Sequence, residues 1–167
     1  MSSAIFLALN RDNDCLYVTS EHYRGEAEPV IHAEAIKARG KWLKGAIDPA
    51  ARGRSQVDGR NLLDMYQELG LNLVEADNAV EAGIYQMTMR LTSGRLKVFK
   101  SCQKLLQEMR LYRRDEKGRV VKQDDHGCDA LRYGIMEMHN ILRTQPAEKK
   151  KESEEYGYSS YSTGWMA

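Results

Sequence analysis

The chain has 167 residues, enough for one domain with a buried core, and none of its apolar runs approaches the length of a transmembrane helix. Its three cysteines are widely spaced without a CxxC pair, no signal peptide is present, and no GxxxxGK[ST] or GxGxxG loop occurs. These features argue against a disulfide framework, a structural zinc and a nucleotide-phosphate loop and indicate an intracellular, reduced protein. The formal net charge is only +1, but residues 95–122 carry ten Lys or Arg against three acids, which is a net charge of +7.

Hydrophobic periodicity and turn residues predict strands and helices along most of the chain. The first two strands are separated by turn formers at residues 10–14, which predicts an antiparallel hairpin. Later strands are separated by helices, which predicts parallel pairing and an α/β protein whose central mixed sheet has helices on its faces. In chain order we expect strands at 4–9 and 15–19, a helix at 30–43, a strand at 46–48, a helix at 61–69, a strand at 71–76, a helix at 79–92, a strand at 96–99, a helix at 102–112, a charged hairpin or loop at 113–122 and a helix from 124 to about 142.

The strand at 46–48 ends in an acidic residue, Asp48, which is followed by Pro49. Functional residues of parallel sheets lie at the carboxyl ends of strands, so Asp48 is a candidate for a carboxylate at the rim of the sheet. The alternative is a local turn in which the Asp side chain bonds the backbone beside the proline. Sequence alone leaves both interpretations open.

Three acids and one histidine lie within six residues where the last helix begins. Asp124 or Asp125 is expected to cap this helix with its side chain, and Asp125, His126 and Asp129 gather on one face of it. The opposite face carries the apolar stripe Leu131, Ile135, Met138 and Leu142. The acidic face is either a capping Asp followed by solvated charge or a site for a hard cation such as Mg²⁺.

These two acidic regions suit one metal site if the fold brings them together. Asp48, His126 and Asp129 would offer two carboxylates and an imidazole to Mg²⁺ or Mn²⁺. Two such ions about 4 Å apart would activate water and stabilise the leaving oxygen in the hydrolysis of a phosphodiester.

Basic residues beside the acidic helix predict contacts with the phosphates of double-stranded DNA, which carry no sequence information. Some lie in a basic loop at 50–59, expected to be mobile, and the others lie in the segment with the net charge of +7. The candidate DNA-binding residues are Arg52, Arg54, Lys100, Lys104, Arg113, Arg114, Arg119 and Lys122.

The run of residues 124–133, Asp-Asp-His-Gly-Cys-Asp-Ala-Leu-Arg-Tyr, resembles the closing motif of the nuclease domain of tailed-phage terminase large subunits, the motors that package DNA. Residues 47–51, 94–98 and 106–109 with Tyr112 support the resemblance, which extends from residue 4 to about residue 142. It implies a ribonuclease H-like fold and metal-dependent cleavage of concatemeric viral DNA in the cytoplasm of the bacterial host. It also implies that Asp48 and Asp129 are metal ligands with His126 and Asp125 beside them. The implied cofactor is Mg²⁺ or Mn²⁺ as two ions, and the implied partners are the ATPase domain, the small terminase subunit and the portal.

The chain departs from the family pattern at its start. The family's first catalytic aspartate lies on an opening strand just before the residues that match 2–4, and Asp12 and Asp14 lie in a turn where they are poor substitutes. We therefore expect residues 1–144 to form an N-terminally incomplete nuclease domain that binds metal weakly and cleaves poorly, followed by a disordered tail at 145–167. The alternatives are a non-catalytic DNA-binding or portal-docking remnant and, less directly, a junction resolvase or integrase-like enzyme of the same fold class.

Overall fold

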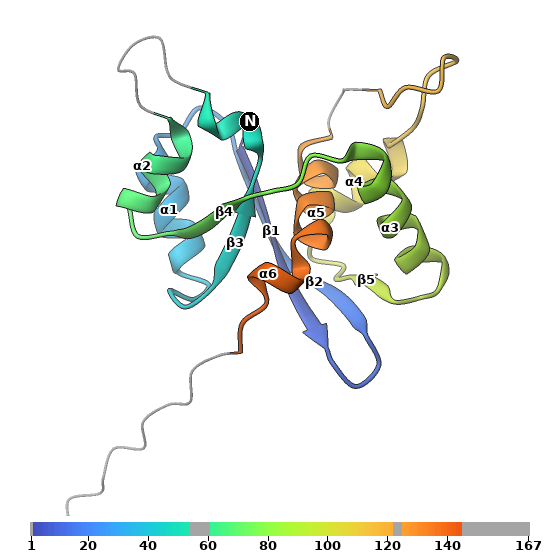
Figure 1. The fold of residues 1–167 in the computed structure, drawn as a ribbon, viewed down its shortest axis with the longest axis horizontal. Coiled ribbons are helices and arrows are strands. Elements are labelled where there is room, and N and C mark those ends of the chain that lie inside the picture. Colours follow the sequence, from blue (N-terminus) through green and yellow to red (C-terminus); the bar gives the residue numbers. More distant parts are fainter. Residues whose placement is uncertain (1, 54–60, 122–124, 145–167) are drawn as a thin grey trace, which may run out of the picture.

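The computed structural model describes residues 2–53, 61–121 and 125–144, and the expected tail at 145–167 lies outside the described residues. Strands and helices alternate along the chain after an initial hairpin, as the sequence predicts (Figure 1). The strands are β1 (Ser2–Asn10), β2 (Cys15–Arg24), β3 (Lys44–Ile47), β4 (Asn72–Glu75) and β5 (Leu96–Val98). The helices are α1 (Pro29–Lys37), the 3-10 helix η1 (Pro49–Arg52), α2 (Leu62–Glu68), α3 (Val80–Thr92), α4 (Gln103–Leu111), α5 (His126–Met136) and α6 (Met138–Ile141).

The strands form two sheets, which together give the predicted mixture of antiparallel and parallel pairs. β1 pairs antiparallel with β2, and β2 pairs parallel with β5. β3 and β4 form a separate parallel pair. Helix α5 contacts both β1 and β3, so this helix bridges the two sheets in the middle of the molecule (Figure 1). The predicted α/β class is confirmed, although the sequence predicted a single sheet.

The main core lies between the β1-β2-β5 sheet and helices α3, α4 and α5. Leu16 and Val18 of β2 meet Leu105 of α4 and Leu131 of α5 in this cluster. The predicted apolar stripe on the last helix is confirmed for Leu131, Ile135 and Met138, which are buried, whereas Leu142 is partly buried. A smaller cluster of Ala33, Tyr66 and Leu71 joins α1 and α2 to the β3-β4 sheet. In the part of the chain that the structure describes, no helix is both long and apolar enough to cross a membrane.

Two predicted helices have different bounds in the structure. The helix expected at 30–43 ends at Lys37, because Gly40 has a φ of +151° and Lys44 and Gly45 already belong to β3. The helix expected to reach residue 142 is interrupted at Glu137, which separates α5 from α6. The buried Glu137 carboxylate accepts hydrogen bonds from the Asp77 backbone N–H (2.9 Å) and from Asn140 Nδ2 (2.7 Å). The interruption therefore links the last helix to the segment that follows β4.

Candidate metal centre

Asp48 lies directly after β3, at the carboxyl end of a parallel strand pair. Its Oδ1 accepts a hydrogen bond from the Ala50 backbone N–H at 2.8 Å, and it thereby caps η1. This is the local turn that the sequence left open as an alternative. The side chain is nevertheless exposed at the rim of the sheet. The cap therefore holds the carboxylate at the carboxyl end of β3, where functional residues of parallel sheets lie.

The start of α5 differs from the prediction that an aspartate caps it with its side chain. Asp125 occupies the N-cap position, but its side chain makes no capping hydrogen bond, and Asp124 lies outside the described residues. Asp125 is 8% exposed, whereas His126 is exposed. The His126 carbonyl oxygen accepts a hydrogen bond from Ser3 Oγ at 2.9 Å, which joins the start of α5 to the start of β1.

Glu108 of α4 is the residue that caps α5. Its Oε2 accepts hydrogen bonds from the backbone N–H groups of Gly127 (2.7 Å) and Cys128 (3.1 Å), and its side chain is buried with only 7% of the residue exposed. A negative charge at a helix N-terminus is favoured by the helix dipole. Burial raises the pKa of Glu108, although the backbone hydrogen bonds from Cys128 and Gly127 oppose this shift.

Gly127 leaves room for this arrangement, since a Cβ at this position would collide with the hydroxyl of Tyr23 and lie 3.0 Å from Glu108 Oε2. The pKa of Tyr23 is itself raised by burial and by the charge of Glu108. The glycine after His126 is thus required by packing. Sequence reasoning placed Glu108 in the segment 106–109 that supports the family resemblance but did not predict its capping role. The available signal for that role was a charged residue between the apolar positions Leu105 and Met109 of an amphipathic helix.

A second glutamate caps α4 in the same way. The two carboxylate oxygens of Glu21, on β2, accept hydrogen bonds from the backbone N–H groups of Lys104 and Leu105, both at 2.9 Å. Glu21 therefore fixes α4 to the sheet, and Glu108 fixes α5 to α4. The position of α5 relative to the β1-β2-β5 sheet therefore depends on both contacts, because Glu21 holds α4 on the sheet and Glu108 holds α5 on α4.

Asp129 is held by a buried arginine one helical turn later. Arg132 is 1% exposed, and its Nη2 and Nε lie 3.2 Å and 3.4 Å from Asp129 Oδ1. The guanidinium also lies over the ring of Tyr133, 4.4 Å from its centroid. Gly83 of α3 makes space for Arg132, because a Cβ there would lie 2.5 Å from Arg132 Cγ. A buried cation beside Asp129 fixes the orientation of its carboxylate.

Tyr133 follows Asp129 on α5 by one helical turn and has a hydrogen bond to the segment after β4. Its hydroxyl donates a hydrogen bond to Asn78 Oδ1 at 3.4 Å. Its pKa is raised by burial, by the charge of Asp48 and by the charge of Asp129, while Arg132 opposes these effects. Two carboxylates that are 81 positions apart in the sequence therefore act on the same phenol. Oxygen donors of this kind suit Mg²⁺ or Mn²⁺.

Within residues 2–53, 61–121 and 125–144, no three His, Cys, Asp or Glu side chains are grouped closely enough to hold a metal ion. The ligand set of Asp48, Asp125, His126 and Asp129 therefore stays a prediction. Asp14, which was judged a poor catalytic substitute, is engaged elsewhere: its carboxylate pairs with Arg90 and Arg95, each at 3.1 Å. It fastens the β1-β2 turn to the end of α3.

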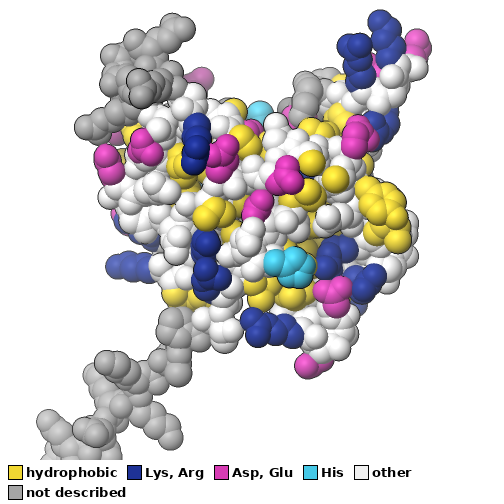
Figure 2. Space-filling view, viewed as in Figure 1, with side chains coloured by type: hydrophobic (Ala, Val, Ile, Leu, Met, Phe, Trp, Pro, Cys, Tyr) yellow, Lys and Arg dark blue, Asp and Glu magenta, His cyan; other side chains and the backbone are white. Residues whose placement is uncertain are grey.

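The predicted DNA-binding residues are exposed where the structure describes them, but two are engaged in ion pairs. Arg52 Nε lies 2.5 Å from Glu75 Oε2, and Arg114 Nη2 lies 2.7 Å from Glu81 Oε2. An antiparallel bridge between Arg114 and Val120 confirms the predicted hairpin, where basic side chains gather (Figure 2, upper right). The exposed basic residues Lys100, Lys104, Arg113 and Arg119 complete the described set, whereas Arg54 and Lys122 lie outside it.

Comparison with known proteins gives concordant matches. The family model of the terminase RNaseH-like domain matches residues 1–138. The terminase large subunit of Salmonella phage P22 is 30% identical over 153 residues, a match that covers 84% of this chain. The chain spans only 30% of the length of that relative.

Solved structures agree with this match. The P22 large terminase nuclease domain superposes with a TM-score of 0.75 at 30% identity, and the match covers 84% of this chain and 76% of that domain. The nuclease domain of the phage SPP1 large terminase, solved with bound Mn, has a TM-score of 0.60 at 13% identity over 83% of this chain and 78% of that one. The nuclease of phage G20c, solved with bound magnesium, has a TM-score of 0.52 at 14% identity, with 80% of each chain covered. These last two likenesses show the shared fold.

Proposed function

This chain belongs to the family of terminase RNaseH-like domains, and from that membership we propose that it is a divalent-metal-dependent endonuclease domain that cuts concatemeric viral DNA during packaging. The match to the P22 terminase large subunit and to the P22 nuclease domain supports this proposal. The chain spans 30% of the P22 protein, so the cutting of DNA is proposed for the domain and not for the whole packaging motor.

The observation that carries the proposal is the match of the terminase RNaseH-like domain model to residues 1–138, and the charges of Asp48 and Asp129, which both raise the pKa of Tyr133, are consistent with it. We propose that these two carboxylates hold the metal, with His126 and Asp125 beside them. Arg132 keeps the Asp129 carboxylate oriented, and Glu108 keeps the start of α5 in place. A bound divalent ion in such a centre activates water and stabilises the leaving oxygen of a phosphodiester.

The choice of Mg²⁺ or Mn²⁺ is supported by two facts. Carboxylate oxygens are the ligands that hard divalent cations prefer. The SPP1 and G20c nuclease structures were solved with manganese and magnesium, respectively. Whether this chain binds one ion or two is part of the proposal to be tested.

Double-stranded DNA is the proposed substrate, held through its phosphates. Lys100 and Lys104 lie beside and within the first turn of α4, and Arg113 and Arg119 lie on the hairpin that leads to α5. All four side chains are exposed, so they can reach a phosphate backbone without losing a structural contact that the fold needs. Arg52 and Arg114 would first have to exchange their glutamate partners for phosphate. In the whole protein we propose an ATPase domain, the small subunit and the portal as further partners.

The test combines metal binding with cleavage. The full chain is incubated with Mn²⁺ and supercoiled plasmid, alongside Asp48→Asn, Asp129→Asn and the control Glu34→Gln, which changes an exposed carboxylate of α1. Asn at position 48 can still accept the bond from Ala50, so this variant removes the charge and keeps the cap. At 100 times the Kd, Mn²⁺ should stabilise the wild-type chain by about 2.7 kcal/mol, or about 5–10 °C in Tm.

We expect metal-dependent nicking and thermal stabilisation in the wild-type chain and in Glu34→Gln, and loss of both in the two aspartate variants. Nicking that persists in Asp129→Asn would contradict the assignment. DNA binding without any stabilisation by Mn²⁺ would instead favour the non-catalytic DNA-binding alternative.

A further inference from the structure

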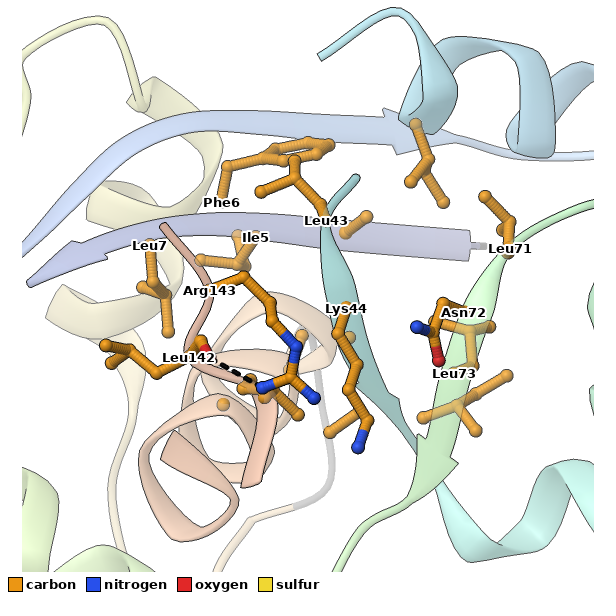
Figure 3. Close-up of a pocket in the computed structure, with 18 of the residues that line it drawn as sticks. Ile5, Phe6, Leu7, Leu43, Lys44, Leu71, Asn72, Leu73, Leu142 and Arg143 are labelled. Carbon is orange, nitrogen blue, oxygen red and sulfur yellow. Dashed lines mark hydrogen bonds between the residues drawn. The ribbon is translucent and has the colours of Figure 1, made fainter. Parts of the chain in front are cut away.

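The β1-β2-β5 sheet carries different side chains on its two faces. On the inner face, Leu16 and Val18 of β2 pack against helices α3, α4 and α5 in the main core. Successive side chains of a strand point to opposite faces, and the close-up in Figure 3 shows this for Phe6 and Leu7, which lie on opposite sides of β1. Tyr17, between the two core residues of β2, therefore lies on the outer face.

The outer face is open to solvent on the side of β5. Ala8 of β1 and Lys97 of β5 are the register partners of Tyr17, and both are exposed. Phe99, two positions after Lys97, continues the pairing with β2 through its backbone N–H and is 48% exposed. Helix α1 and the turn after it contact the other end of this face. The exposed part of the face is thus centred on β2 and β5.

Two aromatic side chains form an ordered pair on this exposed part. The ring centroids of Tyr17 and Phe99 lie 6.3 Å apart, and the ring planes are inclined by 78°, which is an edge-to-face arrangement. Tyr17 therefore restricts the ring of Phe99, while nearly half of Phe99 stays accessible. Aromatic rings held in this way are the surfaces on which unpaired bases stack, and the stacking tolerates any sequence because every base has a π-face.

Positive charge lies beside the aromatic pair. Lys97 Nζ is 5.9 Å from the centroid of the Tyr17 ring, and Lys100, which directly follows Phe99, is exposed. In the described register of β1, β2 and β5, no strand position on the outer face carries an Asp or a Glu. The surface therefore combines an accessible aromatic ring with uncompensated lysines. This combination is complementary to a polyanion whose bases are unpaired.

We infer that the outer face of the β1-β2-β5 sheet binds single-stranded DNA, with a base stacked on Phe99 and phosphates held by Lys97 and Lys100. Duplex DNA suits this surface less, because its bases are stacked on one another and present only their edges in the grooves. Helix α5, which carries Asp129, packs on the inner face, so the bound strand would lie on the opposite side of this sheet. The choice of DNA rests on the proposed function, whereas the stacking surface does not.

The test measures binding of a fluorescent oligothymidylate of about ten nucleotides to the full chain by anisotropy at low salt. The buffer contains EDTA, which withholds divalent ions, so a failure to bind would leave the nuclease proposal to its own nicking assay. A strand of the same length with abasic sites keeps the phosphates and removes the bases. A duplex of the same length keeps the bases but pairs them.

We expect Phe99→Ala and Phe99→Leu to weaken binding of the oligothymidylate by about fivefold to about a hundredfold, and Phe99→Trp to retain it. Phe99→Leu keeps an apolar side chain against Tyr17, so it separates the loss of the ring from the loss of packing. The matched control Tyr85→Ala removes an aromatic ring that is 65% exposed on α3 and should bind as the wild-type chain does. Lys97→Gln should weaken binding and make it less dependent on salt.

The comparison strands separate stacking from charge. The abasic strand and the duplex should both bind more weakly than the oligothymidylate, and neither affinity should change in Phe99→Leu. Equal affinity of Phe99→Leu and the wild-type chain for the oligothymidylate would overturn the inference, as would equal affinity of the wild-type chain for the abasic strand. Absence of binding to every strand would also overturn it and would favour a protein partner for the exposed ring.

Discussion

Glu108→Ala tests whether the glutamate of α4 positions the helix that carries Asp129. The substitution removes the acceptor for two buried backbone N–H groups, those of Gly127 and Cys128, and opens space at the start of α5. Each buried donor left unpaired costs about 1–3 kcal/mol, and loss of a helix cap as a whole costs about 1–2 kcal/mol; because the two donors are the cap, these terms overlap and we expect a destabilisation of about 2–4 kcal/mol. For a domain of this size that corresponds to a fall in Tm of about 5–15 °C.

Urea unfolding followed by circular dichroism would measure this loss, and hydrogen exchange would locate it. Glu108→Gln keeps one acceptor oxygen and should cost less than half as much. The control Glu34→Gln changes an exposed carboxylate that pairs with Lys37 and should shift the free energy of unfolding by less than about 0.5 kcal/mol. If Glu108→Ala unfolds at the same urea concentration as the wild-type chain, with unchanged exchange at Gly127 and Cys128, the capping argument is wrong.

The pH dependence gives an independent check of the same residue. Burial raises the pKa of Glu108 in the folded chain above its ordinary value, so the folded state binds this proton more tightly than the unfolded state does. The resulting contribution to stability is complete below the unfolded pKa and is lost as the pH rises through the folded pKa. Glu108→Gln should therefore flatten the stability profile just above the ordinary range of a glutamate. An identical slope in both proteins would refute the shift.

Three further predictions follow from the packing around α5. Gly83→Ala should destabilise the chain by about 1–2 kcal/mol in urea unfolding, because its Cβ would press on the buried Arg132, whereas Gly25→Ala, with no atom within 4 Å, should be nearly neutral. Burial raises the pKa of Cys128 to about 12, so this thiol should resist iodoacetamide at pH 8 in the folded chain. The same thiol should react when the chain is unfolded in urea. Rapid labelling of Cys128 in the folded chain would contradict its burial. Asp14→Ala should lower the free energy of unfolding in urea by about 1–2 kcal/mol, because it removes the contacts with both arginines. It also places an Ala at a φ of +53°, which an Asp tolerates better. An unchanged free energy of unfolding would show that solvent screens these ion pairs.

Sequence reasoning succeeded where the signal was local. The stripe of Leu131, Ile135 and Met138 identified the buried face of the last helix, and the turn formers before Cys15 identified the hairpin. It failed where a distant residue replaced a local one. The expected cap from Asp124 or Asp125 is supplied by Glu108, 19 positions before Gly127, and nothing in the local pattern of α5 indicates this.

The division into two sheets was also beyond the sequence. Alternating strands and helices predict parallel pairing, but they do not specify which strands are neighbours, because pairing is decided by contacts between distant segments. The candidate site has the same limitation. Asp48 and Asp129 were selected individually from their places at a strand end and a helix start, whereas Arg132 and Tyr133 gain their roles only from the packing that surrounds them.

The serial glutamate caps restrict how such a domain can be divided and recombined. An exchange of gene segments that replaced Glu108 by a residue without an acceptor would leave the buried amide groups of Gly127 and Cys128 unpaired, and one that replaced Glu21 in this way would remove the acceptor of the Lys104 and Leu105 amides. We expect chimaeras of related genes to keep the placement of α4 and α5 where positions 21 and 108 still carry an acceptor side chain, and to be less stable where they do not.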